Sequence, residues 1–379
     1  MKIRKDLPIV ILALLFSCGE KISSTIKCEQ NGPPVFASGP EVKTGSSSLD
    51  FVFKLNQTAK IYYVVYKSDQ GSITSQQLKD EVLSSAANSQ VLVKEVVEVA
   101  CADLEEDVII TASGLPENTS VYAYMVAESN SLDEVLQDAP TFFEAQMKER
   151  QPVETFHSDA ENRDVLYLVY RPEELLKGSE ETFPAIIFLG GNGETSTQGQ
   201  INLIRNGTLP EYLSKGNDIP FIVFSPQHIV NNWNVDMVNE MVEEAKSKYP
   251  VDVDRIHLTG ISGGGIGAWN YAVKYPEQLA SLVPISGDGQ DNKACNLVNM
   301  AVWAFHNDGD GLVATSGSIN MVNAINACNP GPKVEAKLTI FEDAGHNAWR
   351  RVYDINSSEW SKTTIQPIDI YAWISEQSK

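Results

Sequence analysis

The stretch "LTGISGGGIGAW", residues 258–269, decides the fold of the C-terminal half. An apolar strand leads into a run of glycines around one serine, Ser262, and a helical pattern follows. Gly260-Ile261-Ser262-Gly263-Gly264 is the pattern G-x-S-x-G, which between a strand and a helix is typical of a nucleophile elbow. Glycines let the strand and the helix approach closely, and the helix N-terminus favours negative charge that develops beside Ser262. The alternatives are a glycine-rich helix start without chemistry and a phosphate-binding loop. The second is disfavoured because Gly-Lys-Ser/Thr is missing.

Strands and helices alternate from residue 151 onward. The predicted strands are continuous apolar runs, which are typical of a sheet covered on both faces. They are "VLYLVY", "AIIFL", "FIVFS", "IHLTG", "LVPIS", "VWAFH" and "AKLTIF". The segment "WNVDMVNEMVEEAKSKYP" places apolar side chains on one face of a helix. This rhythm predicts a doubly wound, mostly parallel sheet of the α/β-hydrolase class over residues 151–379.

Residues 35–150 have a different pattern. "LDFVFKL" alternates apolar and polar side chains, and further short β segments follow between Gly, Ser, Asn and Asp turns. We expect an all-β sandwich here, as in immunoglobulin-like domains. The piece "SGLPENTSVYAYMVAES" resembles the end of a fibronectin type III domain. This half contains no group of residues typical of catalysis. Its role, as a spacer or as a binding module, is open.

The first residues, "MKIRKDLPIVILALLFSC", combine a basic start with a short apolar run. The run is too short to span a bilayer, so a cleaved export signal over residues 1–17 is expected. The ending Leu15-Phe16-Ser17-Cys18 resembles a bacterial lipobox, in which Cys18 becomes the lipid-modified first residue; an ordinary signal peptide is the alternative. Residues 18–34 would then form a linker. The expected location is the cell envelope, with the membrane reached only through a lipid anchor.

Composition excludes some partners. The chain has 379 residues, 42% of them hydrophobic, and a formal net charge of −21, which disfavours nucleic acid as a partner.

Four cysteines remain after Cys18, and an even number in an exported protein suggests disulfides. One bridge per half, Cys28–Cys101 and Cys295–Cys328, is the simplest pairing, although the sequence does not fix it. No spacing suggests a metal site, and the oligomeric state is open.

A serine nucleophile needs a base and an orienting acid, which in this fold follow it in the order acid, then histidine. Only His306 and His346 lie downstream of Ser262. "FEDAGHNAW" places His346 in a loop after the last strong strand, so we predict it as the base and expect His306 to be structural. "HNDGDGLV" offers two acids, of which Asp310 is preferred because Asp308 lies closer to the strand end. A calcium loop is the alternative for Asp-Gly-Asp-Gly, but the EF-hand continuation is absent.

An acyl-transfer site also needs backbone donors for an oxyanion. The N–H of Gly263 is one candidate because it directly follows the nucleophile. The glycine-rich turn in "AIIFLGGNGETS" supplies the other, for which we predict the N–H of Asn192. A simple tight turn without this role is the alternative.

The motifs "PFIVFSPQH…W", "VDVDRIHLTGISGGGIGAW", "YPEQLASLVPISG", "VWAFHNDGDGLV" and "DAGHNAW" occur in this order. Together they resemble the α/β-hydrolase carboxylesterases known as predicted peptidases, relatives of feruloyl and acetylxylan esterases and of polyhydroxybutyrate depolymerases. The resemblance covers residues 183–373. It implies Ser262 as nucleophile, Asp310 as acid and His346 as base. The family's oxyanion loop usually reads His-Gly-x, whereas Gly190 replaces that histidine here. Some members carry an immunoglobulin-like domain in front.

These observations predict a secreted serine esterase that acts through an acyl-enzyme, without a cofactor or a metal. Its substrate would be a small-molecule ester or an acyl or feruloyl group on a polysaccharide. The same triad could serve a polyester depolymerase, a lipase or a serine peptidase. A non-catalytic surface protein that binds glycans is a further alternative.

Overall fold

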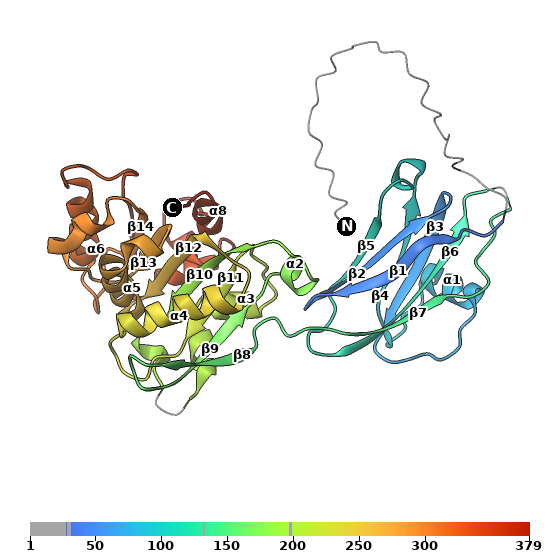
Figure 1. Cartoon of the computed structure of the whole chain (residues 1–379), viewed down its shortest axis with the longest axis horizontal. Coiled ribbons are helices and arrows are strands. Elements are labelled where there is room, and N and C mark those ends of the chain that lie inside the picture. Colours follow the sequence, from blue (N-terminus) through green and yellow to red (C-terminus); the bar gives the residue numbers. More distant parts are fainter. Residues whose placement is uncertain (1–27, 29–31, 132, 197–198) are drawn as a thin grey trace, which may run out of the picture.

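The computed structural model describes residues 28, 32–131, 133–196 and 199–379, so the predicted lipidation site Cys18 lies outside the described residues. Its strands form three sheets (Figure 1). Two small antiparallel sheets come from the N-terminal part of the chain. One large mixed sheet comes from the C-terminal part. Within the described ranges, no helix is both long and apolar enough to cross a membrane.

The large sheet has eight strands in the order β15-β14-β13-β12-β10-β11-β9-β8. Neighbours from β15 to β11 pair in parallel, and β9 and β8 extend the sheet antiparallel. This is the mostly parallel sheet that the strand–helix alternation predicts. The strands are β8 (Val153–Ser158), β9 (Arg163–Tyr170), β10 (Phe183–Leu189), β11 (Ile222–Pro226), β12 (Val251–Ile261), β13 (Ser281–Ile285), β14 (Ala301–Asn307) and β15 (Lys337–Phe341).

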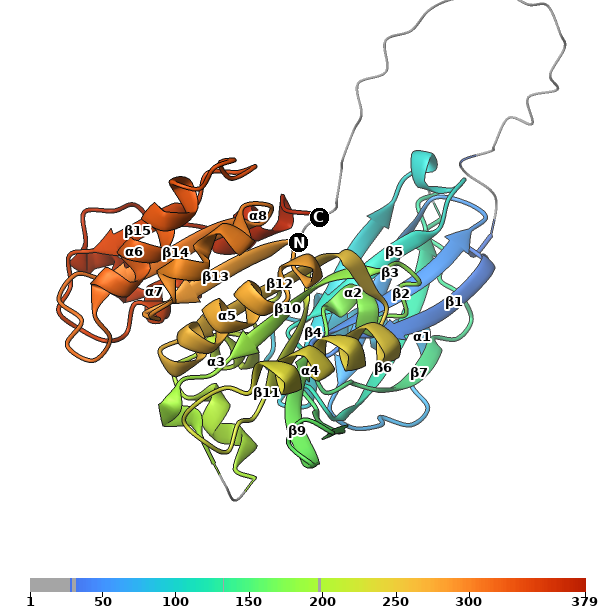
Figure 2. The same ribbon diagram turned by 60° about the vertical axis from the view of Figure 1, so that its left-hand side comes forward.

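Helices cover both faces of this sheet. One hydrophobic cluster joins α4, α5 and α6 to one face, and a second joins α3, α7 and α8 to the other. Figure 2 shows α4 and α5 lying across the first face. In β10, Ile187 belongs to the first cluster and its neighbours Ile186 and Phe188 to the second, which explains why the strand is apolar throughout. The helices are α3 (Leu209–Ser214), α4 (Val235–Lys248), α5 (Gly263–Lys274), α6 (Thr315–Asn326), α7 (Trp349–Val352) and α8 (Ile370–Ser375).

The two N-terminal sheets share one hydrophobic core. Leu49, Phe51, Phe53 and Leu55 of β2 are all buried in it, as their alternation predicts. The sheets have the orders β1-β2-β5 and β4-β3-β6-β7. Their strands are β1 (Phe36–Thr44), β2 (Ser48–Leu55), β3 (Ala59–Tyr66), β4 (Val91–Val99), β5 (Val108–Ser113), β6 (Ser120–Ser129) and β7 (Thr141–Gln146).

This region also contains a helix, α1 (Ser75–Leu83), where the sequence analysis expects only strands and turns. The helix covers the outer face of the four-stranded sheet, where Leu78 packs with Tyr62, Tyr66 and Tyr124. Thr74 and Gln77 form a capping box at its start. The central strands β3 and β6 are therefore buried on both faces.

Both expected disulfides are present. Cys28 bonds to Cys101 in the N-terminal part, and Cys295 bonds to Cys328 in the C-terminal part. The one-bridge-per-half pairing is confirmed.

The carboxylate of Glu173, in α2 (Glu173–Leu176), joins the two parts of the chain, beside an ion pair of Lys177 with Asp50 (2.7 Å). It accepts hydrogen bonds from the backbone N–H groups of Ser46 (3.1 Å) and Ser47 (3.1 Å) and from the hydroxyl of Ser48 (3.0 Å). The guanidinium of Arg150, only 5% exposed, lies 3.2 Å from the same carboxylate. We call Glu173, its three serine partners and Arg150 the seam.

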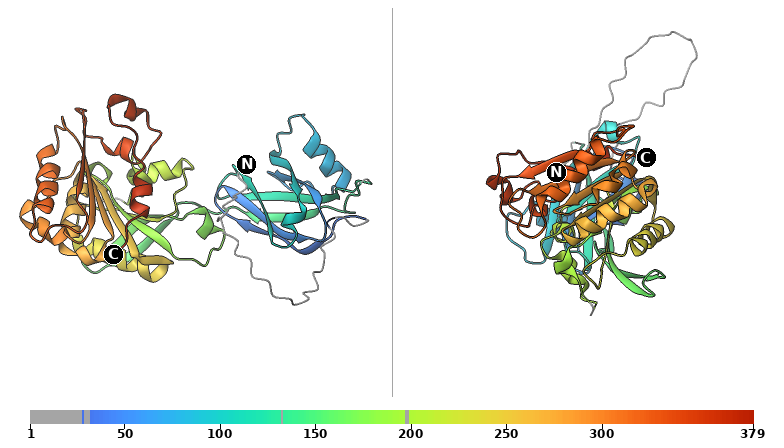
Figure 3. Two further views of the ribbon diagram at one scale, coloured as in Figure 1. Left: turned by 90° about the horizontal axis from the view of Figure 1, so that it is seen from above. Right: turned by 90° about the vertical axis from the view of Figure 1, so that its left-hand side faces the viewer.

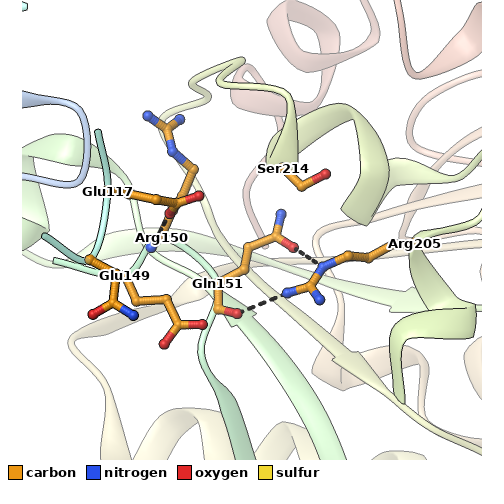
Figure 4. A pocket seen from close by; sticks show the side chains of 7 residues that line it. Glu117, Glu149, Arg150, Gln151, Arg205 and Ser214 are labelled. Atoms are coloured by element: carbon orange, nitrogen blue, oxygen red, sulfur yellow. Dashed lines mark hydrogen bonds between the residues drawn. The ribbon is translucent and has the colours of Figure 1, made fainter. Parts of the chain in front are cut away.

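The seam lies at the edge of the large sheet opposite to the predicted site. Tyr170, which precedes α2, pairs with Val223 near the start of β11, so the seam lies at the amino edge of the parallel strands. Figure 3 shows the small sheets lying to one side of the large sheet. A polar cleft of about 370 Å³ opens beside the seam, where Arg205 donates to Gln151 (Figure 4). No residue predicted for catalysis lines this cleft.

We predict that Glu173→Ala destabilises the protein by about 3 kcal/mol, because it removes the nearer of the two carboxylates that pair with the buried Arg150 and leaves only Asp218, at 3.7 Å. The midpoint of thermal unfolding should fall by at least about 5 °C in calorimetry. The neighbouring Glu174 is exposed and makes no seam contact, so Glu174→Ala is the matched control. Equal midpoints for the two variants would contradict the role of the seam.

The effect of Glu173→Ala should depend on pH. Burial alone would raise the pKa of Glu173, but hydrogen bonds from Ser46, Ser48 and Ser47 and the charge of Arg150 hold it below its ordinary value of 4.5. A lowered folded pKa gives stability that is complete above 4.5 and is lost as the pH falls through the folded value. The difference between wild type and variant should therefore shrink below pH 4.5.

Candidate active site

Ser262 lies between the end of β12 and the start of α5, in a strained backbone conformation with φ +53° and ψ −120°. Few non-glycine residues adopt positive φ, and such strain is typical of functional positions. Two backbone hydrogen bonds hold the turn. The N–H of Ser262 donates to the carbonyl of Ile285 (2.9 Å), and its own carbonyl accepts from Ile266 (3.0 Å). This is the sharp strand-to-helix turn that the G-x-S-x-G pattern predicts.

The glycines around Ser262 permit backbone contacts that no side chain would allow. A Cβ on Gly260 would lie 2.3 Å from the carbonyl oxygen of Gly264. A Cβ on Gly264 would lie 2.0 Å from the carbonyl oxygen of Leu189 and 2.4 Å from that of Gly190. The start of α5 is thus pressed against both β12 and the loop after β10.

His346 reaches Ser262 from the loop after β15. Its Nε2 lies 2.7 Å from the hydroxyl oxygen of Ser262, within hydrogen-bond distance. Its side chain is 14% exposed, so solvent still reaches the imidazole. The ring of Trp349 in α7 meets it edge-on at 5.3 Å and limits its rotation.

Asp310 completes the chain of hydrogen bonds. Its Oδ2 lies 2.6 Å from Nδ1 of His346, and its Oδ1 accepts from the N–H groups of Leu312 (2.9 Å) and Val313 (3.1 Å). Burial alone would raise the pKa of Asp310, but these three donors hold it below its ordinary value. The other acid weighed from the sequence, Asp308, is exposed and accepts from the N–H of Asp343 instead.

His306 lies beside this acid rather than beside the serine. Its Nε2 is 3.4 Å from Asp310 Oδ2 and 3.0 Å from the carbonyl oxygen of Val313, and its Nδ1 is 2.8 Å from the hydroxyl of Ser318. Burial lowers the pKa of His306, so the neutral ring donates from Nε2. It therefore supports the loop that carries Asp310, in agreement with the structural role expected from the sequence.

The two predicted oxyanion donors lie side by side. Asn192 begins a short 3₁₀ turn, Asn192–Glu194, after β10. Its backbone nitrogen would be 3.4 Å from a Cβ on Gly263, and its side-chain oxygen 2.2 Å. In the part of the chain that the structure describes, neither the N–H of Asn192 nor that of Gly263 donates to another protein group. Both donors remain available to a ligand beside Ser262.

Sequence analysis missed the residues that support the loop of Asn192. The indole N–H of Trp233 donates to the carbonyl of Gly190 (3.0 Å), and the ring of His228 stacks on that indole at 4.4 Å. His228 Nε2 also lies 2.9 Å from the hydroxyl of Thr195. Burial lowers the pKa of His228 to about 4, so the ring is neutral at physiological pH. In the sequence, the only signal for this support is the pair of aromatic residues in the segment "PQH…W".

Among the residues the structure describes, no group of three or more His, Cys, Asp or Glu side chains could hold a metal ion. In the acidic loop considered for calcium, Asp310 binds His346 and two backbone N–H groups.

No protein-family model matches the sequence, and no curated protein matches it. Solved structures match this chain in their fold. A thermostable esterase is 18% identical with a TM-score of 0.50, and the match covers 89% of this chain and 99% of that one. A feruloyl esterase module from Clostridium thermocellum is also 18% identical, with a TM-score of 0.42 over 54% of this chain and 86% of that one. At these identities the likeness to the thermostable esterase shows a shared fold and no more.

We predict that Gly264→Ala distorts the elbow, because the new Cβ would meet two backbone oxygens that cannot move independently. Overpacking of this kind costs roughly 2–3 kcal/mol or more. A Cβ on Gly311 would meet nothing within 4 Å, so Gly311→Ala is the matched control for stability. Thermal unfolding of both variants checks this, and a Gly264→Ala midpoint equal to that of the control would contradict the packing account.

Proposed function

We propose that the protein is a serine esterase that hydrolyses carboxylic esters through an acyl-enzyme. One observation carries the proposal, the continuous hydrogen-bond chain Asp310–His346–Ser262 at the strained turn before α5. The shared fold with a thermostable esterase supports the same chemistry. A serine is a weak nucleophile by itself, and a neighbouring base with an orienting acid activates it.

In the proposed acylation step, the hydroxyl oxygen of Ser262 attacks the ester carbonyl while Nε2 of His346 accepts its proton. Asp310 accepts from Nδ1 of His346, which fixes the tautomer that leaves Nε2 free and stabilises the imidazolium that forms. The lowered pKa of Asp310 keeps this carboxylate ionised at neutral pH. The imidazolium then donates its proton to the leaving alcohol.

The N–H groups of Gly263 and Asn192 would stabilise the oxyanion of the tetrahedral intermediate. Water deprotonated by His346 then attacks the acyl-enzyme, the proton returns to Ser262 and the acid is released. These steps use only groups of this chain.

The substrate class and location belong to the proposal too. We infer an acyl or feruloyl ester on a polysaccharide, or a smaller ester, from the sequence resemblance. Export as a lipoprotein anchored at Cys18 rests on the N-terminal sequence. The N-terminal β region, taken as residues 35–150, would act as an immunoglobulin- or fibronectin III-like spacer, and its attachment at the amino edge of the sheet supports that role.

We predict that Ser262→Ala lowers hydrolysis of p-nitrophenyl acetate by at least about 10³-fold, because the nucleophile is lost. Circular dichroism must show that the variant is folded. A fluorophosphonate probe should label wild type and not the variant. A folded wild type that neither hydrolyses a series of small esters nor reacts with the probe would contradict the proposal. Activity on peptides or polyesters alone would replace small esters as the proposed substrate class.

We also predict that Asp310→Asn lowers kcat by about 10³–10⁴-fold, because the amide favours the wrong tautomer of His346. Asp308→Asn keeps an oxygen for the N–H of Asp343 and should retain activity within about threefold. The same ester assay on both variants separates the two acids. A larger loss in Asp308→Asn would reverse the assignment.

A further inference from the structure

Asn307 is a fully buried polar residue at the carboxyl end of β14, and the mechanism above does not use it. It is the last residue of the strand, and its exposed fraction is 0%. Its backbone carbonyl accepts from the hydroxyl of Thr315 at 2.7 Å and from the N–H of Asp310 at 3.4 Å. The loop that carries the proposed acid therefore begins on this residue.

The side chain of Asn307 reaches the loop that carries the proposed base. Its amide Nδ2 donates to the carbonyl of Gly345 and lies 3.3 Å from Oδ1 of Asn347. Gly345 and Asn347 are the two neighbours of His346 in the chain. One amide group thus holds the backbone before His346 and the side chain after it.

The backbone contacts between the two loops lie before His346. The N–H of Gly309 donates to the carbonyl of Asp343 at 3.1 Å, and a Cβ on Gly309 would lie 2.7 Å from the Cα of Ala344. Among the described residues, segment 345–347 forms hydrogen bonds outside residues 343–350 only with Asn307 and through the imidazole of His346. Apart from the triad itself, Asn307 is therefore the hydrogen-bonding group that ties this segment to the sheet.

Only the donor half of this amide is used. Oδ1 of Asn307 is buried and has no hydrogen-bond partner in the part of the chain that the structure describes. Burying a polar atom without a partner costs free energy, and a leucine of similar size would fill the same space without that cost. The N–H donors that face the His346 loop are what an asparagine supplies at this position and an apolar residue does not.

We propose that Asn307 is a positioning residue, which holds segment 345–347 so that the imidazole of His346 meets Asp310 and Ser262 at the same time. The ring must place Nδ1 2.6 Å from the acid and Nε2 2.7 Å from the nucleophile. Its side-chain torsions can satisfy both distances only where the backbone of His346 is correctly placed. The inference rests on the proposed esterase function, and it predicts a loss in the proton-transfer steps rather than in substrate affinity.

The test measures kcat and KM for p-nitrophenyl acetate in wild type, Asn307→Leu and Asn307→Ser, after circular dichroism has shown which variants fold. Both substitutions remove the amide, the first at similar size and the second at smaller size. Each should lower kcat by about 10- to 100-fold, the range for a catalytic group displaced by about 1 Å, and change KM by less than about threefold. A folded variant with wild-type kcat would overturn the positioning role, and so would loss of folding in both.

Asn326 provides the matched control. Its amide also ties two segments together, because Nδ2 donates to the carbonyl of Ala336 and Oδ1 accepts from the N–H of Ala336, both at 2.9 Å. This pair lies at the amino end of β15, at the edge of the sheet opposite to Ser262. Asn326→Leu should therefore lower stability and retain kcat. A loss of kcat equal to that in Asn307→Leu would overturn the inference.

A double variant with His346→Ala separates positioning from general distortion. A residue that acts only through His346 has nothing to position once the imidazole is absent. Asn307→Leu should therefore change the residual rate of His346→Ala, which the oxyanion donors and substrate binding supply, by less than about threefold. An equal fold-loss with and without His346 would overturn the proposal.

The rate of fluorophosphonate labelling separates this inference from the proposed function, because His346 activates Ser262 in that reaction too. If wild type is not labelled, the esterase proposal fails and this inference fails with it. If wild type and Asn307→Leu are labelled at the same rate, only the role of Asn307 fails. Slower labelling of Asn307→Leu with normal labelling of Asn326→Leu supports it.

Discussion

The close approach of α5 to the ends of β10 and β12 is the constraint on which the site depends. Gly264 lies against the carbonyl oxygens of Leu189 and Gly190, so one backbone contact places both Ser262 and the loop of Asn192. His346 lies in the loop after the carboxyl end of β15, and Asp310 lies in the loop after the carboxyl end of β14, in the same sheet. A sheet buried on both faces holds these ends rigidly, and the loops need only supply side chains. The strain at Ser262 is tolerated because the surrounding core is extensive.

The seam and the proposed active site lie at opposite edges of the large sheet. Glu173 and Arg150 join the small sheets to the amino edge of the large sheet, whereas Ser262 lies at its carboxyl edge. Parallel strands place every βα loop on one edge, so attachment at the other edge leaves those loops free. A partner or a polymer can therefore approach Ser262 without displacing the β region. The seam is polar and charge-paired rather than apolar, as contacts between parts of a chain often are.

Much of this could be predicted from the sequence because its signals are local. The glycines around Ser262 and the apolar runs of the strands follow directly from backbone sterics and burial. The helix α1 was missed although Thr74 and Gln77 carry a capping-box pattern, because its apolar face is short and lies between strong strands. Glu194 could not be predicted, since a glutamate after a glycine turn is ordinarily solvated and only the fold shows its burial.

Two carboxyl groups of this region, Asp310 and Glu194, show how hydrogen bonds decide whether burial raises the pKa of an acid. Asp310 receives hydrogen bonds from His346 and from two backbone N–H groups, which outweigh its burial and lower its pKa. Glu194 forms no ion pair with any described residue, and burial raises its pKa. An ionised acid suits the histidine side, where positive charge forms, whereas negative charge beside an oxyanion would oppose it. The hydrogen bond from His346, which has no counterpart at Glu194, therefore distinguishes the acid with the lowered pKa from the acid with the raised pKa.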